Sequence, residues 1–304
     1  MPPPTSDRPR SVAVVPTARG LAARLATGLK PLARVLGHEQ PEASLLLLWP
    51  TAWGAILASR ALSNAWLWLA LVVACAAVHM AVRFASCALV DREMALAHGI
   101  SRSGAWMHVT ALMASALVLV AVCSVLAVQW ALMALVLAVL TPWVRRHSYL
   151  AQVYVAAVMS SGVLVGFVAI TDKAPSAEAW LLWLAAMLWV TASVLWKAMV
   201  TRKTDEKEQR KSMAILLGET AIVAQLLILG CGYWALVMLG ARAQWDASYY
   251  IGLGCALALA LWALWQARRR EPERDLRAYR LGLVQAAIVL AALCLAPAST
   301  PIAG

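Results

Sequence analysis

Apolar residues follow one another in long, continuous runs along most of the chain. The runs cover residues at about 44–59, 64–86, 104–122, 124–143, 149–170, 178–200, 213–239, 247–266 and 280–297. Most of them approach the length of about 20 residues that an α-helix needs to cross the hydrocarbon core of a bilayer. Continuous apolar runs exclude a β-barrel, whose strands alternate between polar and apolar residues. The pattern therefore predicts an all-α integral membrane bundle of about nine transmembrane helices around a central cavity.

The first 43 residues differ from the rest of the chain. They are rich in proline, alanine and arginine, and residues 18–36 have an amphipathic character. No apolar stretch of the kind found in a cleaved signal peptide precedes residue 43, so we expect no such peptide. We predict that residues 1–43 form a cytoplasmic, partly flexible N-terminal segment and that residues 44–304 form the nine-helix membrane domain.

Composition supports the membrane assignment. Hydrophobic residues make up 62% of the chain and charged residues only 13%, whereas soluble domains are nearer to half and a quarter. A soluble fold of this length could not bury so much apolar surface. Tryptophan is abundant, with 15 residues against 2 phenylalanines, and indole rings favour the boundary between membrane and water.

The distribution of positive charge predicts the orientation of the helices. If the N-terminus is cytoplasmic and nine spans follow, then of the 26 basic residues only Arg60, Lys173 and Arg242 fall on the opposite side. Basic loops favour the cytoplasmic side of a membrane, and an even number of spans would scatter them over both sides. The C-terminus is therefore predicted to be periplasmic. Because the net charge of +11 lies in clusters between apolar runs, we interpret it as a topology signal and expect no nucleic-acid partner.

Two loops on the predicted cytoplasmic side carry acidic residues. The loop after the second span contains Asp91 and Glu93, and the loop after the sixth span contains Asp205 with two neighbouring glutamates. Such loops can hold a divalent metal between them, because Mg²⁺ takes carboxylate and phosphate oxygens as ligands. Charges at the ends of spans are also typical of solvated caps and of side chains that reach the membrane surface. The residues themselves leave both interpretations open.

Five short segments between residues 36 and 297 carry a family resemblance. They read PEASLLLLWPT (41–51), RFASC (83–87), TPWVRRHSYLAQ (141–152), AM with KSMAI (198–199 and 211–215), and YYIGL with WALWQARRR (249–253 and 262–270). In this order and spacing they resemble motifs of the UbiA-type polyprenyltransferases: PIGTWLLLWPT, RSAGC, YPFMKRxTxxPQ, AM with KSTAI, and the late helices. The resemblance extends in particular to the 4-hydroxybenzoate polyprenyltransferases of bacterial ubiquinone synthesis.

The resemblance implies a function in the bacterial inner membrane. A polyprenyl group would move from its diphosphate to an aromatic acceptor similar to 4-hydroxybenzoate, on the ubiquinone or prenylquinone pathway. The partners would be the bilayer, a polyprenyl diphosphate or prenylated quinone lipid, and the acceptor. Family members hold Mg²⁺ with Asp-rich motifs and stabilise the departing diphosphate. The implied metal ligands are Asp91, Glu93 and Asp205. The implied diphosphate contacts are Arg83, Arg145, Lys197 and Lys211, and the implied cavity residues are Tyr149 and Gln152.

The acidic motifs depart from those of the family. The first family motif reads NDxxDxxxD, and here Val90 and Asp91 take its first two positions while the downstream DxxxD is absent. Alternatively, Asp91 and Glu93 represent the later portion of the motif, and in either register only two carboxylates remain. In the second motif the expected acids fall on positions 194, 201, 204 and 205, of which only Asp205 is acidic. Loss of one electrostatic contact to a transition state typically costs about 10²–10³ in rate. A second hypothesis is therefore a noncatalytic UbiA-like protein that binds isoprenoid or quinone lipid, or that partners an active homologue.

Some polar residues lie inside the predicted spans. Glu219 lies one turn inside the seventh span, where an ionisable group is costly and often functional, so we include it among the candidate cavity residues. The alternative is that its side chain reaches back to the membrane surface. His79 lies in the middle of the second span, and we expect a buried, hydrogen-bonded histidine there rather than a metal ligand.

The predicted topology can be tested with a reporter that distinguishes the two sides of the membrane. Fused after Gly304, it should report a periplasmic location, because nine spans separate this end from a cytoplasmic N-terminus. A fusion after Lys207, in the most basic loop, serves as the cytoplasmic control. A cytoplasmic signal from the Gly304 fusion would contradict the odd number of spans.

Overall fold

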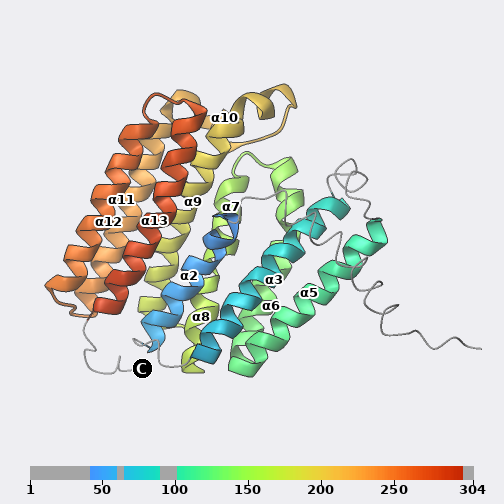
Figure 1. Ribbon diagram of the computed structural model, residues 1–304, viewed down its shortest axis with the longest axis vertical. Coiled ribbons are helices and arrows are strands. Elements are labelled where there is room, and N and C mark those ends of the chain that lie inside the picture. The colour runs from blue at the N-terminus through green and yellow to red at the C-terminus, as the bar shows by residue number, and fades with distance from the viewer. Residues whose placement is uncertain (1–41, 60–64, 90–100, 297–304) are drawn as a thin grey trace, which may run out of the picture.

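In the computed structural model, residues 42–59, 65–89 and 101–296 are described, and they fold almost entirely into helices (Figure 1). In chain order the elements are α2 (Glu42–Ser59), α3 (Ala65–Leu89), α5 (Arg102–Cys123), α6 (Val125–His147), α7 (Ala151–Ser160), α8 (Gly162–Thr171), α9 (Ala177–Lys207), α10 (Met213–Leu217), the 3₁₀ turn η1 (Gly218–Thr220), α11 (Ala221–Arg242), α12 (Ala247–Ala267) and α13 (Pro272–Leu295). The predicted N-terminal segment lies outside the described residues, apart from its last two, which begin α2.

The helices confirm the prediction of an all-α membrane bundle. Within the described ranges, seven spans are long and apolar enough to cross a bilayer, and two shorter apolar helices cover Leu45–Ser59 and Trp66–Val82. Helices α7 and α8 together form one span, and α10, η1 and α11 form another. Each of these spans coincides with one of the nine predicted apolar runs.

Several helix ends differ from the prediction. Helix α9 continues to Lys207 rather than ending near residue 200, because its polar end is supported by pairs one turn apart, such as Arg202 with Glu206 at 2.8 Å. Helix α13 begins at Pro272 rather than near residue 280, with proline in its first turn and acidic residues beside it. The seventh span is interrupted at Gly218, whose φ of +53° suits glycine.

The boundary between the third and fourth spans rests on Ser124. This residue is extended, with φ −161° and ψ 133°, and it ends α5 and begins α6. Its hydroxyl accepts a hydrogen bond from the Ala127 amide and donates one to Asp172 in the turn after α8. A single capping residue thus separates two spans within an almost uninterrupted apolar stretch.

Helix α2 packs against α8 so closely that glycine is required at the contact. A Cβ atom at Gly54 would lie 2.0 Å from the carbonyl oxygen of Val163, and one at Gly166 would lie 2.4 Å from that of Thr51. A Cβ at Gly162 would meet the Thr51 hydroxyl. Small residues four positions apart allow such approach between membrane helices, where van der Waals packing replaces the hydrophobic effect as the attraction between spans.

Two tryptophans join α2 and α9 to α13. The indole nitrogen of Trp53 donates to the carbonyl of Ala286 at 3.1 Å, and that of Trp189 donates to the carbonyl of Gly282 at 3.1 Å. The two indole rings also contact each other, with centroids 5.5 Å apart. Buried indoles need such acceptors, so these bonds hold the group of α9, α11, α12 and α13 against α2 (Figure 1).

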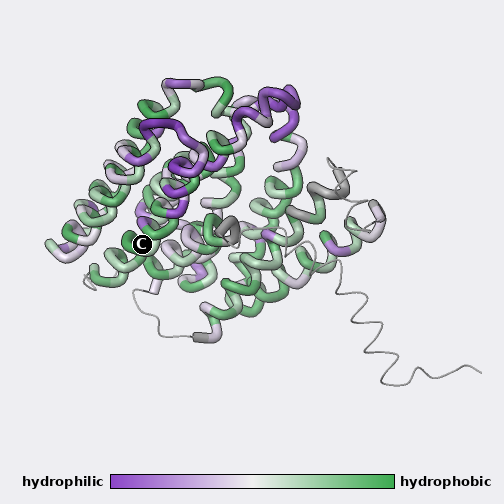
Figure 2. The backbone as a smooth tube through the Cα atoms, turned by 45° about the horizontal axis from the view of Figure 1, so that its top comes forward, coloured by the Kyte–Doolittle hydropathy of each residue, from purple (hydrophilic) through white to green (hydrophobic). Residues whose placement is uncertain are grey.

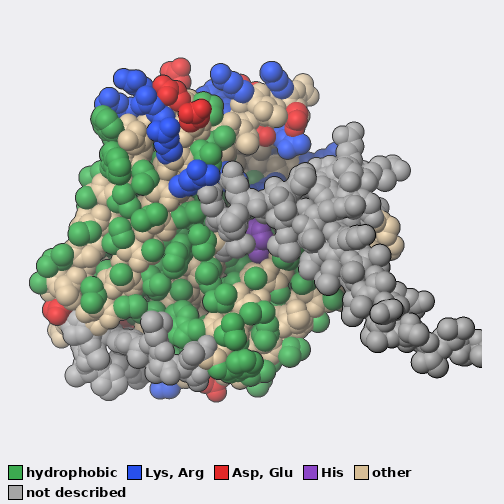
Figure 3. All heavy atoms as spheres, in the orientation of Figure 1, with side chains coloured by type: hydrophobic (Ala, Val, Ile, Leu, Met, Phe, Trp, Pro, Cys, Tyr) green, Lys and Arg blue, Asp and Glu red, His purple; other side chains and the backbone are tan. Residues whose placement is uncertain are grey.

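The bundle has one strongly polar end. Hydrophilic segments gather around α10 and the turn between α12 and α13 (Figure 2). Lysine and arginine side chains are concentrated at the same end, and hydrophobic side chains are spread over the surface below it (Figure 3). This distribution matches the charge asymmetry that the sequence shows, and it marks the end where charged ligands can approach.

The α2–α8 contact can be tested by comparing Gly166→Ala with Gly230→Ala. A methyl group at position 166 must push against backbone, and overpacking of this kind costs about 1–3 kcal/mol. At Gly230 the added atom would meet nothing within 4 Å, and alanine is the better helix former. Thermal unfolding in detergent should therefore show a lower Tm for Gly166→Ala alone. Equal Tm values for the two variants would contradict the close contact.

Candidate functional site

An apolar cavity of about 70 Å³ lies among α2, α3, α5, α6, α7 and α8. Its lining is mainly aliphatic, and the polar groups that border it include Thr51 and Cys75. The Cys75 thiol donates to the Thr51 hydroxyl at 3.3 Å, and that hydroxyl donates to the carbonyl of Leu47 at 2.9 Å. Because these polar groups bond to each other and to the backbone, the cavity offers a hydrocarbon-like surface to a ligand.

Basic residues from three helices lie within electrostatic range of one another toward the polar end of the bundle. His79 lies one turn beyond Cys75 on α3, toward the polar end. It interacts electrostatically with both Arg145 of α6 and Lys197 of α9, and Arg145 interacts in turn with Asp205. We call His79, Arg145, Lys197 and Asp205 the polar mouth. With more cationic than anionic groups, it is suited to an anionic ligand.

Tyr279 supports Lys197 within the mouth. Its ring, on α13, is fully buried, and the Lys197 ammonium lies 5.8 Å from the ring centroid. An ammonium group over an aromatic face is attracted by the ring's quadrupole. This contact fixes the direction of a flexible lysine side chain before any ligand binds.

Lys211 lies where the loop after α9 meets the end of α6. Its ammonium donates to the carbonyl of His147 at 3.2 Å and lies 5.7 Å from the ring centroid of Tyr149. The side chains of Lys211 and Tyr149 are exposed, so Lys211 can turn toward an anion without leaving a buried charge unpaired. The structure thus brings two of the sequence-predicted residues together.

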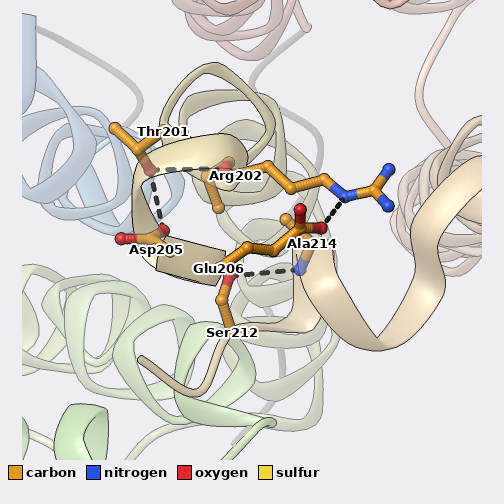
Figure 4. A network of polar contacts seen from close by, with 7 residues as sticks. Thr201, Arg202, Asp205, Glu206, Ser212 and Ala214 are labelled. Atoms are coloured by element: carbon orange, nitrogen blue, oxygen red, sulfur yellow. Dashed lines mark hydrogen bonds and ion pairs between the residues drawn. The ribbon is translucent and has the colours of Figure 1, made fainter. Parts of the chain in front are cut away.

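Gln152 connects α7 to the start of α10. Its amide nitrogen donates to the hydroxyl of Ser212 at 3.1 Å, and its amide oxygen accepts from the backbone of Met213 at 3.1 Å. Ser212 also caps α10 by accepting from the Ala214 amide at 3.2 Å (Figure 4). Gln152, predicted as a cavity residue, therefore holds the helix that follows the basic loop.

The acidic residues at the end of α9 are already engaged by neighbours. Asp205 accepts a hydrogen bond from Thr201 at 3.0 Å, and Glu206 pairs with Arg202 at 2.8 Å. The two carboxylates point away from the helix in different directions (Figure 4). In the described part of the chain, no group of three or more His, Cys, Asp or Glu side chains could hold a metal. A Mg²⁺ site that includes Asp205 therefore needs further carboxylates from elsewhere in the chain.

Four predicted site residues contribute no described contact to the polar mouth. Asp91 and Glu93 lie outside the described residues, as does the side chain of Arg83, whose backbone belongs to α3. Glu219 lies on η1 with an exposed side chain. The roles assigned to these four residues, like those of the other predicted site residues, stay predictions.

Sequence reasoning passed over His79 and Tyr279. We expected a buried, hydrogen-bonded histidine at position 79; its side chain is half-buried, and Arg145 and Lys197 are near enough to act on it electrostatically. One signal was available: His79 and Arg83 are spaced by one helical turn, so they lie on one face of α3. No signal pointed to Tyr279, because its partner Lys197 is distant in the chain.

The fold and the site together define a membrane-embedded helical bundle whose apolar cavity ends in a basic polar mouth. The fold is similar to that of a UbiA homolog from Aeropyrum pernix, with a TM-score of 0.69 at 20% identity over 84% of this chain and 98% of that chain. It is also similar to that of a UbiA homolog from Archaeoglobus fulgidus bound to GPP and Mg²⁺, with a TM-score of 0.64 at 15% identity over 88% and 99%.

Residues 47–289 match the model of the UbiA prenyltransferase family, and the chain belongs to this family. It is 34% identical over 266 residues to a 4-hydroxybenzoate octaprenyltransferase from Xanthomonas campestris, covering 81% of this chain and 85% of that one. It is 33% identical over 265 residues to an enzyme of the same name from Xylella fastidiosa, covering 83% and 87%. The family resemblance that the motifs predicted is confirmed.

Gln152→Leu should loosen α10 without unfolding the bundle. The substitution leaves the Met213 amide without its side-chain acceptor, and an unmet hydrogen bond costs about 1–3 kcal/mol. Hydrogen exchange followed by mass spectrometry should show faster exchange across 213–217. Tyr154→Phe, on the same helix, removes a hydrogen bond to the carbonyl of Leu137 and serves as the control. Equal exchange at 213–217 in both variants would contradict the role of Gln152.

Proposed function

We propose that this protein transfers a polyprenyl group from its diphosphate to the ring of an aromatic acceptor of the 4-hydroxybenzoate type, as its named relatives suggest. The proposal rests on one observation, the apolar cavity with a basic mouth at its polar side. A polyprenyl diphosphate has the matching polarity, with a hydrocarbon tail and an anionic head. The acceptor places the reaction on the ubiquinone or prenylquinone pathway.

The basic residues of the mouth would bind the head group. Arg145 and Lys197 both act electrostatically on His79, and guanidinium and ammonium groups form strong charge-assisted hydrogen bonds with phosphate oxygens. Lys211 and Arg83 would add positive charge from neighbouring segments. The contact of Lys197 with Tyr279 would reduce the entropy lost when the lysine engages the diphosphate.

The cavity would protect the reacting carbon from water. In the transfer, the bond between the first prenyl carbon and the diphosphate oxygen breaks, and its electron pair leaves with the diphosphate. A carbon of the aromatic ring then bonds to the prenyl carbon, and the ring loses the proton at that position. An aliphatic lining favours capture by the ring, because it excludes water that would compete for the allylic cation.

Mg²⁺ is the cofactor that this reaction implies, and Asp205 together with Asp91 and Glu93 would hold it. When bound, the metal neutralises negative charge on the departing diphosphate. The residues of the mouth would orient the same head group whether or not the metal is present.

A second candidate function is noncatalytic binding of an isoprenoid diphosphate or quinone lipid, alone or in partnership with an active homologue. The observation that favours it is the replacement of family acids on α9. Val194 is buried at 8% exposure among apolar neighbours, and Thr201 uses its hydroxyl to bind Asp205. Fewer carboxylates would still allow an anion to bind to the basic residues, whereas cleavage of the C–O bond needs more stabilisation.

We also propose a location in the bacterial inner membrane, with the polar mouth facing the cytoplasm. Basic loops are retained on the cytoplasmic side during insertion. Both the aromatic acceptor and the prenyl diphosphate would then reach the mouth from the cytoplasmic face or laterally from the bilayer.

Prenyl transfer can be measured in membranes that contain the protein, with a polyprenyl diphosphate, 4-hydroxybenzoate and Mg²⁺. Asp91→Asn, Glu93→Gln and Asp205→Asn should each lower product formation by about 10²–10³-fold if these carboxylates serve the transition state. Asp246→Asn removes a carboxylate that caps α12 at the opposite end and should retain wild-type turnover. Turnover that persists unchanged after chelation of divalent metals would contradict the Mg²⁺-dependent mechanism.

Binding of a labelled prenyl diphosphate separates the two candidate functions. The paired substitution Arg145→Gln with Lys197→Gln should weaken binding under either function, and Arg242→Gln, at the opposite end, should leave it unchanged. Binding without turnover in the wild type would favour the noncatalytic function. Binding that is insensitive to Arg145 and Lys197 would contradict the assignment of the polar mouth.

A further inference from the structure

The turn between α12 and α13 lies at the polar end of the bundle (Figure 1) and carries three consecutive arginines, Arg268, Arg269 and Arg270. The structure gives them different environments. Arg270 is largely buried, with 18% of its side chain exposed, whereas Arg268 and Arg269 are exposed. Their functions should therefore differ.

Arg270 fixes the shape of the turn. Its guanidinium pairs with buried Asp275 at 3.1 Å and donates to the amide oxygen of buried Gln225 at 3.0 Å. Gln225 in turn donates to the carbonyl of Ala192 on α9 at 3.5 Å. Arg270 also has a φ of +53°, a conformation that ends α12 sharply. The network ties the turn to α9, α11 and α13.

The other acidic residues of the turn are occupied as well. Glu271 pairs with Arg274 at 2.6 Å, and Glu273 lies 3.9 Å from Arg277. Within the described residues, no carboxylate pairs with Arg268 or Arg269. Two exposed positive charges thus stand beside a turn whose own acids are already neutralised, and an anion from outside the chain can approach them.

Aromatic rings give this pair of arginines a position relative to the bilayer. Trp262 and Trp265, on the last turns of α12, are 51% and 52% exposed. The guanidinium carbon of Arg268 lies 4.6 Å from the centroid of the Trp265 ring. Exposed tryptophans favour the headgroup level of a membrane, and exposed Leu261 continues the apolar surface toward the hydrocarbon. The arginines therefore lie at the depth of lipid phosphates.

We propose that Trp262, Trp265, Arg268 and Arg269 form a binding surface for the phosphate group of an anionic phospholipid. The two guanidinium groups would pair with the phosphate oxygens, and the indole rings and Leu261 would contact the upper part of the acyl chains. Net negative charge distinguishes this ligand from a zwitterionic phospholipid, whose own cation reduces its attraction to arginine. The surface lies on α12, which does not line the apolar cavity, so the proposal is independent of prenyl transfer.

Native mass spectrometry of the full chain in detergent, titrated with phosphatidylglycerol or phosphatidylcholine, tests this surface. We expect the wild type to bind phosphatidylglycerol more tightly. Each basic residue near a membrane surface contributes about fivefold in affinity for anionic lipid. Arg268→Gln with Arg269→Gln should therefore weaken phosphatidylglycerol binding by about 25-fold and leave phosphatidylcholine binding unchanged. Arg269→Gln alone, at an exposed position, gives the smaller loss without removing the contact with Trp265.

The control is Arg274→Gln with Arg277→Gln, which removes the same charge from arginines that already have acidic partners. This variant should lose less phosphatidylglycerol affinity than Arg268→Gln with Arg269→Gln, because it leaves the two arginines beside Trp262 and Trp265 in place. If both double variants lost phosphatidylglycerol affinity equally, the lipid would be attracted by the overall positive charge of this end and not by the proposed site. Equal affinity of the wild type for the two lipids would overturn the proposal. The same result is expected if a second copy of the chain, rather than lipid, covers the surface.

Discussion

The close contact between α2 and α8 is the constraint on which the rest of the site depends. Gly54 and Gly166 bring backbone against backbone, and Thr51 lies at the centre of the contact and at the edge of the cavity. Hydrocarbon outside the protein is as apolar as the helices themselves, so only good packing can hold two spans together. The position of the cavity follows, because α3, α5 and α6 pack around this pair rather than filling the space beside it.

At the polar end of the bundle, basic residues outnumber the acidic residues that could pair with them, so this end can attract anions. Around the α12–α13 turn, Asp275, Glu271 and Glu273 are each paired with an arginine. At the mouth, Asp205 is the acidic member of a group in which Arg145 and Lys197 supply the positive charge. A surplus of cations at both places suits anionic ligands of amphiphilic character, and this is the basis for the diphosphate proposed at the mouth and the lipid phosphate proposed beside α12.

Buried polar bonds between distant helices hold these surfaces in place. Trp53 and Trp189 donate to backbone carbonyls of α13, and Arg270 reaches α9 through Gln225. In an apolar medium a polar group without a partner is costly, so each bond selects one relative position of its helices. Tyr279, on the same helix that receives the indole bonds, is thereby placed beside Lys197.

The sequence by itself determined the helical spans, their order and the family, because an unpaired backbone cannot remain in hydrocarbon and a run of about 20 apolar residues has one stable form there. It also indicated Arg145, Lys197 and Lys211 through motifs that are local in the chain. Only the tertiary structure decided where the helices end, that Gln152 bonds to Ser212 and that Lys197 lies over the ring of Tyr279. These contacts join residues far apart in the chain, and their distances depend on how closely helices pack, which no local pattern encodes.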